Sequence, residues 1–331
     1  MNIHRIFSLL ALMLVAVSCQ QKHVEQSAPA IAVDPLPSWN EGATKNAILG
    51  YVKNIIDSTS ANFIPENDRI ATFDNDGTLW AERPYVQELF AMYQIKKMVE
   101  KNPSLAKKQP FKTVLEGDKA TMAKGGEKFL IDLLGATHTG MSEDEFEQST
   151  KDFFSTAVFP GKNVPVKQIR YQPQLELLEF LRHNRFKIYI CTGGTIEFVR
   201  SISEEYYGIP SEQVIGTSFK YVFVDSSNTI FRQPALNHFN DKTGKPASIQ
   251  LHIGKHPVLA CGNEGGKGDI AMLEFSQEGK YPSLQLLVNH DDEAREFLYS
   301  EADSASLKAA ALNKWTVISI KNDWKSVFPK Q

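Results

Sequence analysis

The chain has 331 residues, of which 42% are hydrophobic and 23% are charged, as in ordinary globular proteins. Its 36 Lys and Arg against 39 Asp and Glu give a net charge of −3, which excludes a strongly basic nucleic-acid binder and does not favour binding to a membrane surface or a polyanion. Three cysteines are too few for a disulfide scaffold, and a single apolar run excludes a polytopic membrane protein.

The first residues predict export. A basic start precedes the apolar run 6–17, which is short for a membrane-spanning helix, and Cys19 follows it. Residues 16–19 resemble a bacterial lipobox, which implies that Cys19 is acylated; the alternative is an ordinary signal peptide with a chance cysteine. We therefore expect a lipoprotein signal peptide at 1–18 and a lipid anchor that holds the protein to a bacterial cell membrane, on a periplasmic or surface-facing side. The polar residues 19–40, with three prolines, predict a flexible tether.

Helical and strand-like segments follow the tether. Apolar residues recur at helical spacing within 40–60, and a short apolar strand at 70–73 leads into an Asp-rich loop. Residues 81–165 have almost no strand signal and predict a helical module. Within this module, Ser142 and Glu145 have the spacing of a helix capping box.

Beyond residue 173, strands alternate with helices. The predicted helices are 175–182, 195–207 and 246–252, the predicted strands are 186–191, 213–217, 257–261, 284–288 and 315–320, and residues 221–224 and 229–231 form a predicted hairpin. This alternation indicates an α/β fold with a doubly wound parallel sheet. We expect residues 41–80 and 166–331 to form this core, with 81–165 as an insertion.

The loop after the first strand carries candidate chemistry. Asp74 and Asp76 lie where an open α/β sheet binds ligands, at the carboxyl end of a strand, and Gly77 permits a tight turn. Two carboxylates so close repel each other unless one is protonated or a cation lies between them, and Mg²⁺ suits oxygen ligands. The alternative is a solvated Asp-Gly turn. It is disfavoured because two further predicted strands end in the polar segments 192–194 and 262–263.

Four segments, in chain order, resemble the motifs of the haloacid dehalogenase superfamily. Residues 73–79, FDNDGTL, resemble motif I of its DxDGT phosphatase branch, and residues 188–194 resemble motif II. Residues 241–246, DKTGKP, place a lysine at a helix start, as motif III does, and residues 260–273 resemble motif IV of the phosphoserine-phosphatase-like branch. The resemblance implies a Rossmann-like core in which the helical module 81–165 is a C1-type cap.

The same resemblance implies a phosphomonoesterase that requires Mg²⁺ and works through an aspartyl-phosphate. Asp74 would be the nucleophile. Asp76 would be the general acid and then the base, with its backbone carbonyl on the metal. Thr192, together with the backbone of Gly193 and Gly194, would hold the phosphoryl oxygens.

The resemblance leaves alternatives for the lysine and for the metal ligands. Lys245 opens a predicted helix and is our choice for the lysine that neutralises the growing charge, with Lys242 as the alternative. Motif IV has Asn263 where the family commonly has an acid, so Asp269 becomes the first choice for the side-chain ligand, and Glu264 is a further candidate. The expected metal ligands are Asp74, Asp76, Asp269 and Asn263.

Residues just after motif I are candidate substrate contacts. Trp80, Glu82 and Arg83 should lie at the hinge into the cap, where they either face the substrate or only pack the hinge. Trp80 and Tyr85 are also candidates for holding a choline-like cation through cation–π contacts.

Other polar residues have less certain roles. Glu197 and Arg200 either line the same cleft or are solvated helix charges, and we favour the second interpretation. Residues 289–292, NHDD, form either a second metal site or, as we favour, hydrogen bonds that support a loop. Cys191 and Cys261 lie in or at the ends of apolar strands and are expected to be buried structural thiols.

The sequence therefore predicts an exported Mg²⁺-dependent phosphomonoesterase that acts on a small phosphate ester. Two alternatives remain. One is a lipoprotein of the same fold that binds a phosphorylated ligand without turnover, which Asn263 in motif IV keeps open. The other is a phosphotransferase. We expect no nucleic-acid partner, and contact with a membrane only through the lipid anchor.

Overall fold

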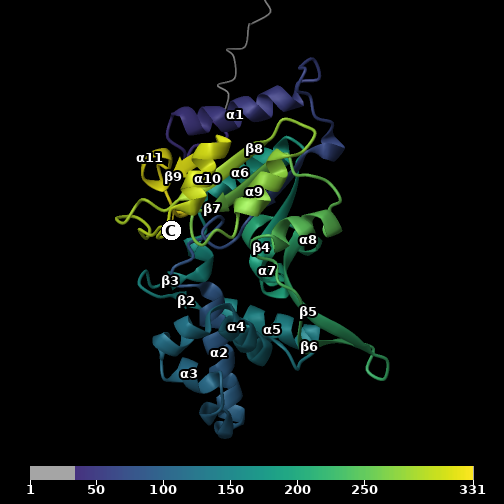
Figure 1. Ribbon diagram of the computed structural model, residues 1–331, viewed down its shortest axis with the longest axis vertical. Coiled ribbons are helices and arrows are strands. Elements are labelled where there is room, and N and C mark those ends of the chain that lie inside the picture. Colours follow the sequence, from purple (N-terminus) through teal and green to yellow (C-terminus); the bar gives the residue numbers. More distant parts are fainter. Residues whose placement is uncertain (1–33, 331) are drawn as a thin grey trace, which may run out of the picture. The chain divides into compact units, whose positions relative to one another are not determined.

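A seven-stranded sheet in the order β6-β5-β4-β1-β7-β8-β9 organises residues 34–330, the part of the chain that this computed structural model describes (Figure 1). The strands are β1 (Ile70–Phe73), β4 (Lys187–Thr195), β5 (Val214–Val224), β6 (Thr229–His238), β7 (Leu259–Asn263), β8 (Leu284–Asn289) and β9 (Thr316–Ser319). All neighbouring strands pair in parallel except β5 and β6. The predicted α/β fold with a parallel central sheet is confirmed.

Helices cover both faces of this sheet, because successive side chains of a buried strand point to opposite faces. Phe73 and Ile190 belong to the hydrophobic cluster of one face, and Tyr189 and Ile215 to a cluster of the other. The first face is covered by α1 (Ala43–Ile56), α6 (Gln172–His183) and α7 (Ile196–Tyr207), and the second by α8 (Gly244–His252), α9 (Ile270–Gln277) and α10 (Ala305–Asn313). A short helix, α11 (Ile320–Asp323), follows β9.

Between β1 and α6 the chain forms helices instead of continuing the sheet, and Figure 1 shows them gathered below it. This helical insert consists of α2 (Val86–Lys101), α3 (Phe111–Leu115), α4 (Lys119–His138) and α5 (Glu143–Thr156), and the small ribbon β2 (Val158–Phe159) and β3 (Val164–Pro165) follows it. The predicted capping box is confirmed: Ser142 Oγ accepts from the Glu145 N–H at 3.2 Å, and Glu145 accepts from the Ser142 N–H at 2.8 Å. The module boundaries at 81 and 165 stay predictions.

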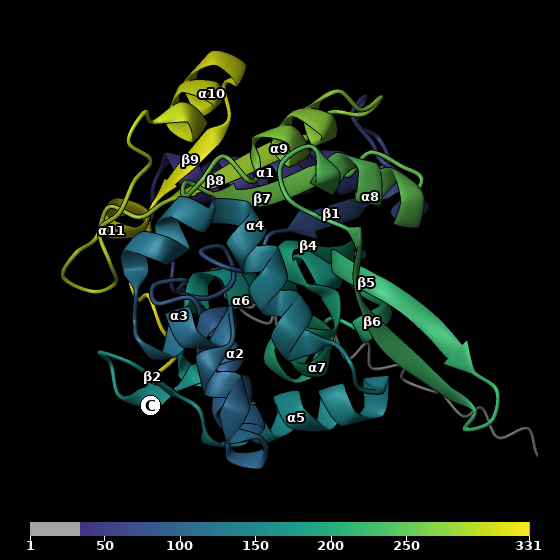
Figure 2. The ribbon, with the colours of Figure 1, turned by 60° about the horizontal axis from the view of Figure 1, so that its bottom comes forward.

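The hairpin made by β5 and β6 differs from the prediction and extends out from the sheet (Figures 1 and 2). The predicted strand 213–217 and the first predicted hairpin arm are one strand, because Ser218 and Phe219 between them pair with β6. Arg232 of β6 is fully buried and reaches the insert, where its guanidinium lies 2.8 Å from Glu143. The same guanidinium lies 3.1 Å from Glu197 of α7. The hairpin thus ties the insert to the core.

The predicted signal peptide at 1–18, Cys19 and the tether up to residue 33 lie outside the described residues. Within residues 34–330, no helix combines the length and the apolar character that crossing a bilayer requires.

Candidate active site

The carboxyl ends of β1, β4 and β7 meet at one edge of the sheet, because β1 pairs in parallel with both of its neighbours. Asp74, directly after β1, donates its main-chain N–H to the carbonyl of Cys261 at 2.9 Å, which fixes the start of the loop. Gly77 turns this loop at a φ of +76°, and a Cβ there would lie 2.1 Å from the amide of Asn263. The close approach of motif I to motif IV therefore requires glycine at this position.

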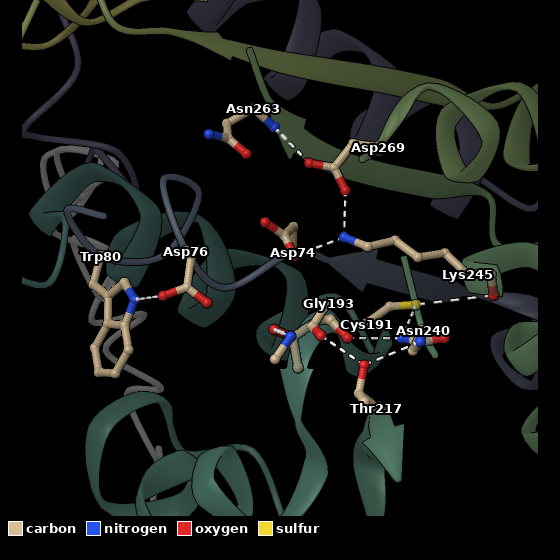
Figure 3. Close-up of polar contacts among 12 residues, drawn as sticks. Asp74, Asp76, Trp80, Cys191, Gly193, Thr217, Asn240, Lys245, Asn263 and Asp269 are labelled. Carbon is tan, nitrogen blue, oxygen red and sulfur yellow. Dashed lines mark hydrogen bonds and ion pairs between the residues drawn. The ribbon is translucent and has the colours of Figure 1, made fainter. Parts of the chain in front are cut away.

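Lys245 lies between Asp74, which follows β1, and Asp269, which lies in the loop after β7. Its Nζ is 2.7 Å from Asp74 Oδ1 and 2.5 Å from Asp269 Oδ1, and all three side chains are buried (Figure 3). Burial disfavours the ammonium, but the two carboxylates outweigh it and raise the pKa of Lys245. Lys242 is exposed and lies 4.0 Å from Asp241. The lysine in contact with the candidate nucleophile is therefore Lys245.

The same burial acts on the candidate nucleophile. Burial and the nearby Asp269 carboxylate raise the pKa of Asp74 well above its usual range, while the charge of Lys245 acts in the opposite direction. The Lys245 ammonium donates directly to Asp74 Oδ1 at 2.7 Å, and this hydrogen bond stabilises the ionised carboxylate.

Asp76 is held by two side chains from the segment that follows it. Trp80 donates from Nε1 to Asp76 Oδ1 at 2.9 Å, and Gln87 of α2 lies 3.5 Å from Oδ2. Burial raises the pKa of Asp76, and the Trp80 hydrogen bond opposes this shift. Trp80 is fully buried against the rings of Phe154 and Tyr206, so it is not placed to contact a substrate, contrary to the prediction. Its burial also removes it from any cation–π site for a ligand.

The end of β4 lies beside the same cluster. Gly193 and Gly194 line a cavity, whereas Thr192 is fully buried and its Oγ1 accepts from the Gly194 N–H at 3.0 Å. Thr217 of β5 donates to the Gly193 carbonyl at 2.6 Å and so fixes the position of the loop. A Cβ on Gly194 would lie 1.7 Å from Gln87 Nε2, so any larger residue here would displace the Gln87 side chain. The catalytic role of Thr192 stays a prediction.

Motif IV places Asp269, but not Glu264, at the site. Asp269 Oδ2 accepts from the main-chain N–H of Asn263 at 3.0 Å. Glu264 turns away, and its Oε1 accepts from the Glu301 N–H at 2.5 Å. Glu264 is therefore excluded as a ligand in this arrangement.

At the hinge, Glu82 and Arg83 form an ion pair, with Arg83 Nε 3.2 Å from Glu82 Oε1. Glu82 lines the cavity, and its burial raises the pKa of this carboxyl to about 8 even though Arg83 is close. The Arg83 guanidinium lies over the rings of Tyr85 and Tyr299, at 4.5 and 4.9 Å from their centroids. One face of the Tyr85 ring therefore already has a cation beside it.

The remaining predicted polar residues have structural contacts. Glu197 is bound to Arg232 and Arg200 donates to a main-chain carbonyl, so neither is a purely solvated helix charge. The segment 289–292 supports its loop as favoured, with hydrogen bonds that link it to β9 and to the residues that follow it. Cys191 and Cys261 are buried free thiols, as predicted, and burial raises the pKa of both.

A cavity of about 350 Å³ lies between this cluster and the helical insert. Asp74, Asp76 and Lys245 line its charged end. The helical insert adds both apolar and polar lining: Ala91, Leu130, Leu133 and Leu134, together with Gln87 and Glu88. This volume suits a small molecule.

The charged end has the composition of a cation site. The buried carboxylates of Asp74 and Asp269 share a single ammonium, that of Lys245, which leaves an excess of one negative charge, and Asp76 lines the same cavity. Within residues 34–330, no three His, Cys, Asp or Glu side chains form a metal-ligand cluster. Mg²⁺ does not need one, because it is commonly held by one or two carboxylates and keeps several waters. These residues therefore fit Mg²⁺ better than a metal that needs a full protein cage.

Comparison with known proteins gives a family and a fold. The sequence profile of the family described as haloacid dehalogenase-like hydrolase matches residues 71–274, which contain all four motif segments. A conserved, functionally unknown protein from Anaerococcus prevotii DSM 20548 superposes with a TM-score of 0.58 at 15% identity, over 88% of this chain and 97% of that chain. A protein of unknown function from Bordetella pertussis Tohama I gives 0.50 at 12% identity, over 76% and 97%. No protein of curated function matches the sequence.

Proposed function

The chain belongs to the haloacid dehalogenase-like hydrolase family, and we propose that it is a Mg²⁺-dependent phosphomonoesterase that hydrolyses a small phosphate ester through an aspartyl-phosphate. One observation carries the proposal. The Asp74 carboxylate is bound to Lys245 beside Asp76, at the charged end of a cavity that also has apolar lining from the helical insert. A nucleophile, a proton carrier and a cation are thus within reach of one phosphoryl group.

In the first step, an oxygen of Asp74 attacks phosphorus and the ester P–O bond breaks. The leaving alkoxide takes the proton of Asp76, whose burial raises its pKa and so keeps the proton available. Lys245 holds Asp74 in place and balances part of the charge that gathers on the phosphoryl oxygens. The backbone of Gly193 lines the same cavity, and its N–H would bind one of those oxygens.

In the second step, Asp76 takes a proton from a water whose oxygen attacks phosphorus. The bond between phosphorus and Asp74 breaks, which releases phosphate and restores both carboxyl groups. A bound Mg²⁺ would neutralise charge on the phosphoryl oxygens. Asp74, the backbone carbonyl of Asp76, Asp269 and the amide of Asn263 would hold it.

The test is phosphate release by the folded protein from a panel of small phosphate esters, with Mg²⁺ and with chelator. We expect release that requires Mg²⁺ and is lost in Asp74→Asn, while the exposed variant Asp57→Asn keeps wild-type activity. Release that survives Asp74→Asn would mean that the nucleophile is another residue. Esters whose alcohol has an apolar portion should be accepted, because Leu130, Leu133 and Leu134 line the insert side of the cavity.

The same assay separates the two alternatives. A folded protein that binds phosphate esters but releases no phosphate would be the non-catalytic binding protein. Adding an acceptor alcohol distinguishes a phosphotransferase, because a new alcohol phosphate would form in place of free phosphate.

We also propose that the protein is exported and anchored by a lipid on Cys19. Support comes only from the sequence of residues 1–19. Radiolabelled palmitate should label the wild-type protein in a bacterial host, and Cys19→Ala should abolish both the label and membrane fractionation. Labelling that persists in Cys19→Ala would overturn this assignment.

A further inference from the structure

Behind Asn263 lies a row of buried polar groups that the proposed steps do not use. The Asn263 amide is 3.3 Å from His290 Nε2, and His290 Nδ1 is 3.2 Å from Glu296 Oε2. The other oxygen of Glu296 accepts from the Tyr171 hydroxyl at 2.6 Å. His290 is fully buried, Glu296 is 4% exposed, and the ring of Tyr299 stacks on the imidazole at 4.1 Å.

The direction of these hydrogen bonds follows from the chemistry of the groups. Burial raises the pKa of Tyr171 well above its usual range, so its hydroxyl keeps its hydrogen and donates to Glu296. A carboxylate only accepts, so the hydrogen between Glu296 and His290 is on Nδ1. The amide nitrogen of Asn263 lies at Nε2 of the same ring, which therefore acts as the acceptor in this contact. Only the amide nitrogen of Asn263 can donate to it, because the amide oxygen has no hydrogen.

This direction determines where the amide oxygen of Asn263 points. With its nitrogen on His290, the oxygen lies 3.2 Å from Asp269 Oδ2 and 3.2 Å from the main-chain carbonyl oxygen of Asp76. Figure 3 shows this oxygen on the side of Asp269. Three oxygen atoms with no hydrogen between them repel one another, unless a cation lies among them.

The opposite orientation of the amide has a different cost. The nitrogen would then donate to Asp76 and Asp269, but the oxygen would need a hydrogen on His290 Nε2. In that orientation the amide oxygen would face His290 and not the space between Asp76 and Asp269. The contact of the amide nitrogen with His290 thus gives the orientation that offers an oxygen to a cation.

We propose that His290 and Glu296 are positioning residues that turn the amide oxygen of Asn263 toward the metal. The inference rests on the proposed function, because it assumes that the site holds Mg²⁺. It explains how an amide serves at a motif IV position where the family commonly has an acid. A carboxylate offers an oxygen in either rotation, whereas an amide must be oriented.

The segment that carries His290 and Glu296 is fastened to the motif IV loop at a second point. Glu301 accepts from the N–H groups of Gly266 and Lys267, at 2.9 and 2.6 Å, and its own N–H donates to Glu264. The segment after β8 therefore holds both the loop backbone and the Asn263 side chain. This double attachment gives the imidazole a fixed place from which to orient the amide.

The test measures Mg²⁺ affinity by isothermal titration calorimetry, without substrate. In Glu296→Gln the new amide accepts from Tyr171 and donates to His290 Nδ1, so the ring hydrogen moves to Nε2 and Asn263 turns its nitrogen toward the site. We expect Mg²⁺ binding to weaken by about 10- to 100-fold. His290→Phe keeps a ring on Tyr299 but removes the acceptor, and it should weaken binding in the same range. The exposed variant Glu293→Gln makes the same chemical change nearby and should bind Mg²⁺ like the wild type.

Repeating the Glu296→Gln substitution in a chain that also carries Asn263→Asp distinguishes positioning of the amide from simple structural support. In an Asn263→Asp chain a carboxylate oxygen faces the site in either rotation, so adding Glu296→Gln should leave Mg²⁺ affinity nearly unchanged. Equal losses in the two backgrounds, or no loss in the Asn263 background, would overturn the inference while the proposed phosphatase stands. A wild-type protein that binds no Mg²⁺ would overturn both. Thermal unfolding of each variant verifies that the protein titrated is folded.

Discussion

Glu82→Gln should change how the stability of the protein depends on pH. Glu82 is 4% exposed, and its burial raises the pKa of the carboxyl from 4.5 to about 8. Arg83 lies 3.2 Å away and favours the carboxylate, but the Arg83 side chain is 40% exposed and Asp76 and Asp269 oppose its effect. Desolvation therefore outweighs the ion pair.

The sign follows from proton counting. The folded state keeps the Glu82 proton up to about pH 8, whereas the unfolded state releases it near pH 4.5. Between these two values the folded state binds more protons, so the free energy of unfolding falls as the pH rises. The interval from 4.5 to about 8, at about 1.4 kcal/mol for each pH unit, amounts to about 5 kcal/mol. Glutamine does not titrate and removes this loss.

Urea unfolding of both proteins, with chelator present, measures the effect across a series of pH values. Relative to the wild type, Glu82→Gln should gain stability steadily from about pH 5 to about pH 8 and gain no more above that. The exposed variant Glu293→Gln should run parallel to the wild type throughout. Parallel curves for Glu82→Gln would refute the reasoning, because they would mean that Glu82 titrates alike in the folded and unfolded states.

Three further outcomes follow from the same contacts. Trp80→Phe removes the hydrogen bond to Asp76, so the pKa of Asp76 should rise further. The alkaline limb of the pH profile of kcat/KM should then shift to higher pH, and an unmoved limb would contradict this role of Trp80. Lys245→Met leaves Asp74 and Asp269 buried without their shared cation. This change should abolish phosphate release and lower the free energy of unfolding by about 3–5 kcal/mol. An unchanged midpoint of urea unfolding would contradict the expected loss of stability. Mg²⁺ at about 100 times its Kd should stabilise the protein by about 2.7 kcal/mol, and chelator should reverse this; no change in melting temperature would count against the site.

Much of the fold was predictable because the core strands are short apolar runs that alternate with helices. The runs at 70–73, 186–191 and 257–261 became β1, β4 and β7, and parallel pairing then brought the residues after them to one edge. The β5–β6 hairpin was predicted too short, because its exposed residues lack the apolar alternation of a half-buried strand. Arg232, just beyond the predicted second arm, contacts the helical insert, and no local pattern encodes that contact.

The positions of Asp74 and Asp76 in the site were predictable, because both acids lie in the loop that directly follows a recognisable strand. The site was not predictable where a side chain acts from a distant segment. Gln87 bonds to the Thr195 N–H across 108 positions, and neither residue belongs to a recognisable pattern. Trp80 was noticed, but burial changes its role from contacting substrate to holding Asp76.

The balance of charge at the site connects motif IV to the segment after β8. Asp74, Asp76 and Asp269 already exceed the charge of Lys245, and a further buried carboxylate would add to the desolvation cost and to the repulsion. Asn263 avoids that cost, but its amide presents hydrogen-bond donors on one side and an acceptor on the other. An amide at this position is therefore useful to a cation only if a neighbour fixes its orientation. The buried His290–Glu296 pair is placed to do so, and the uncommon asparagine and this buried pair form one structural solution.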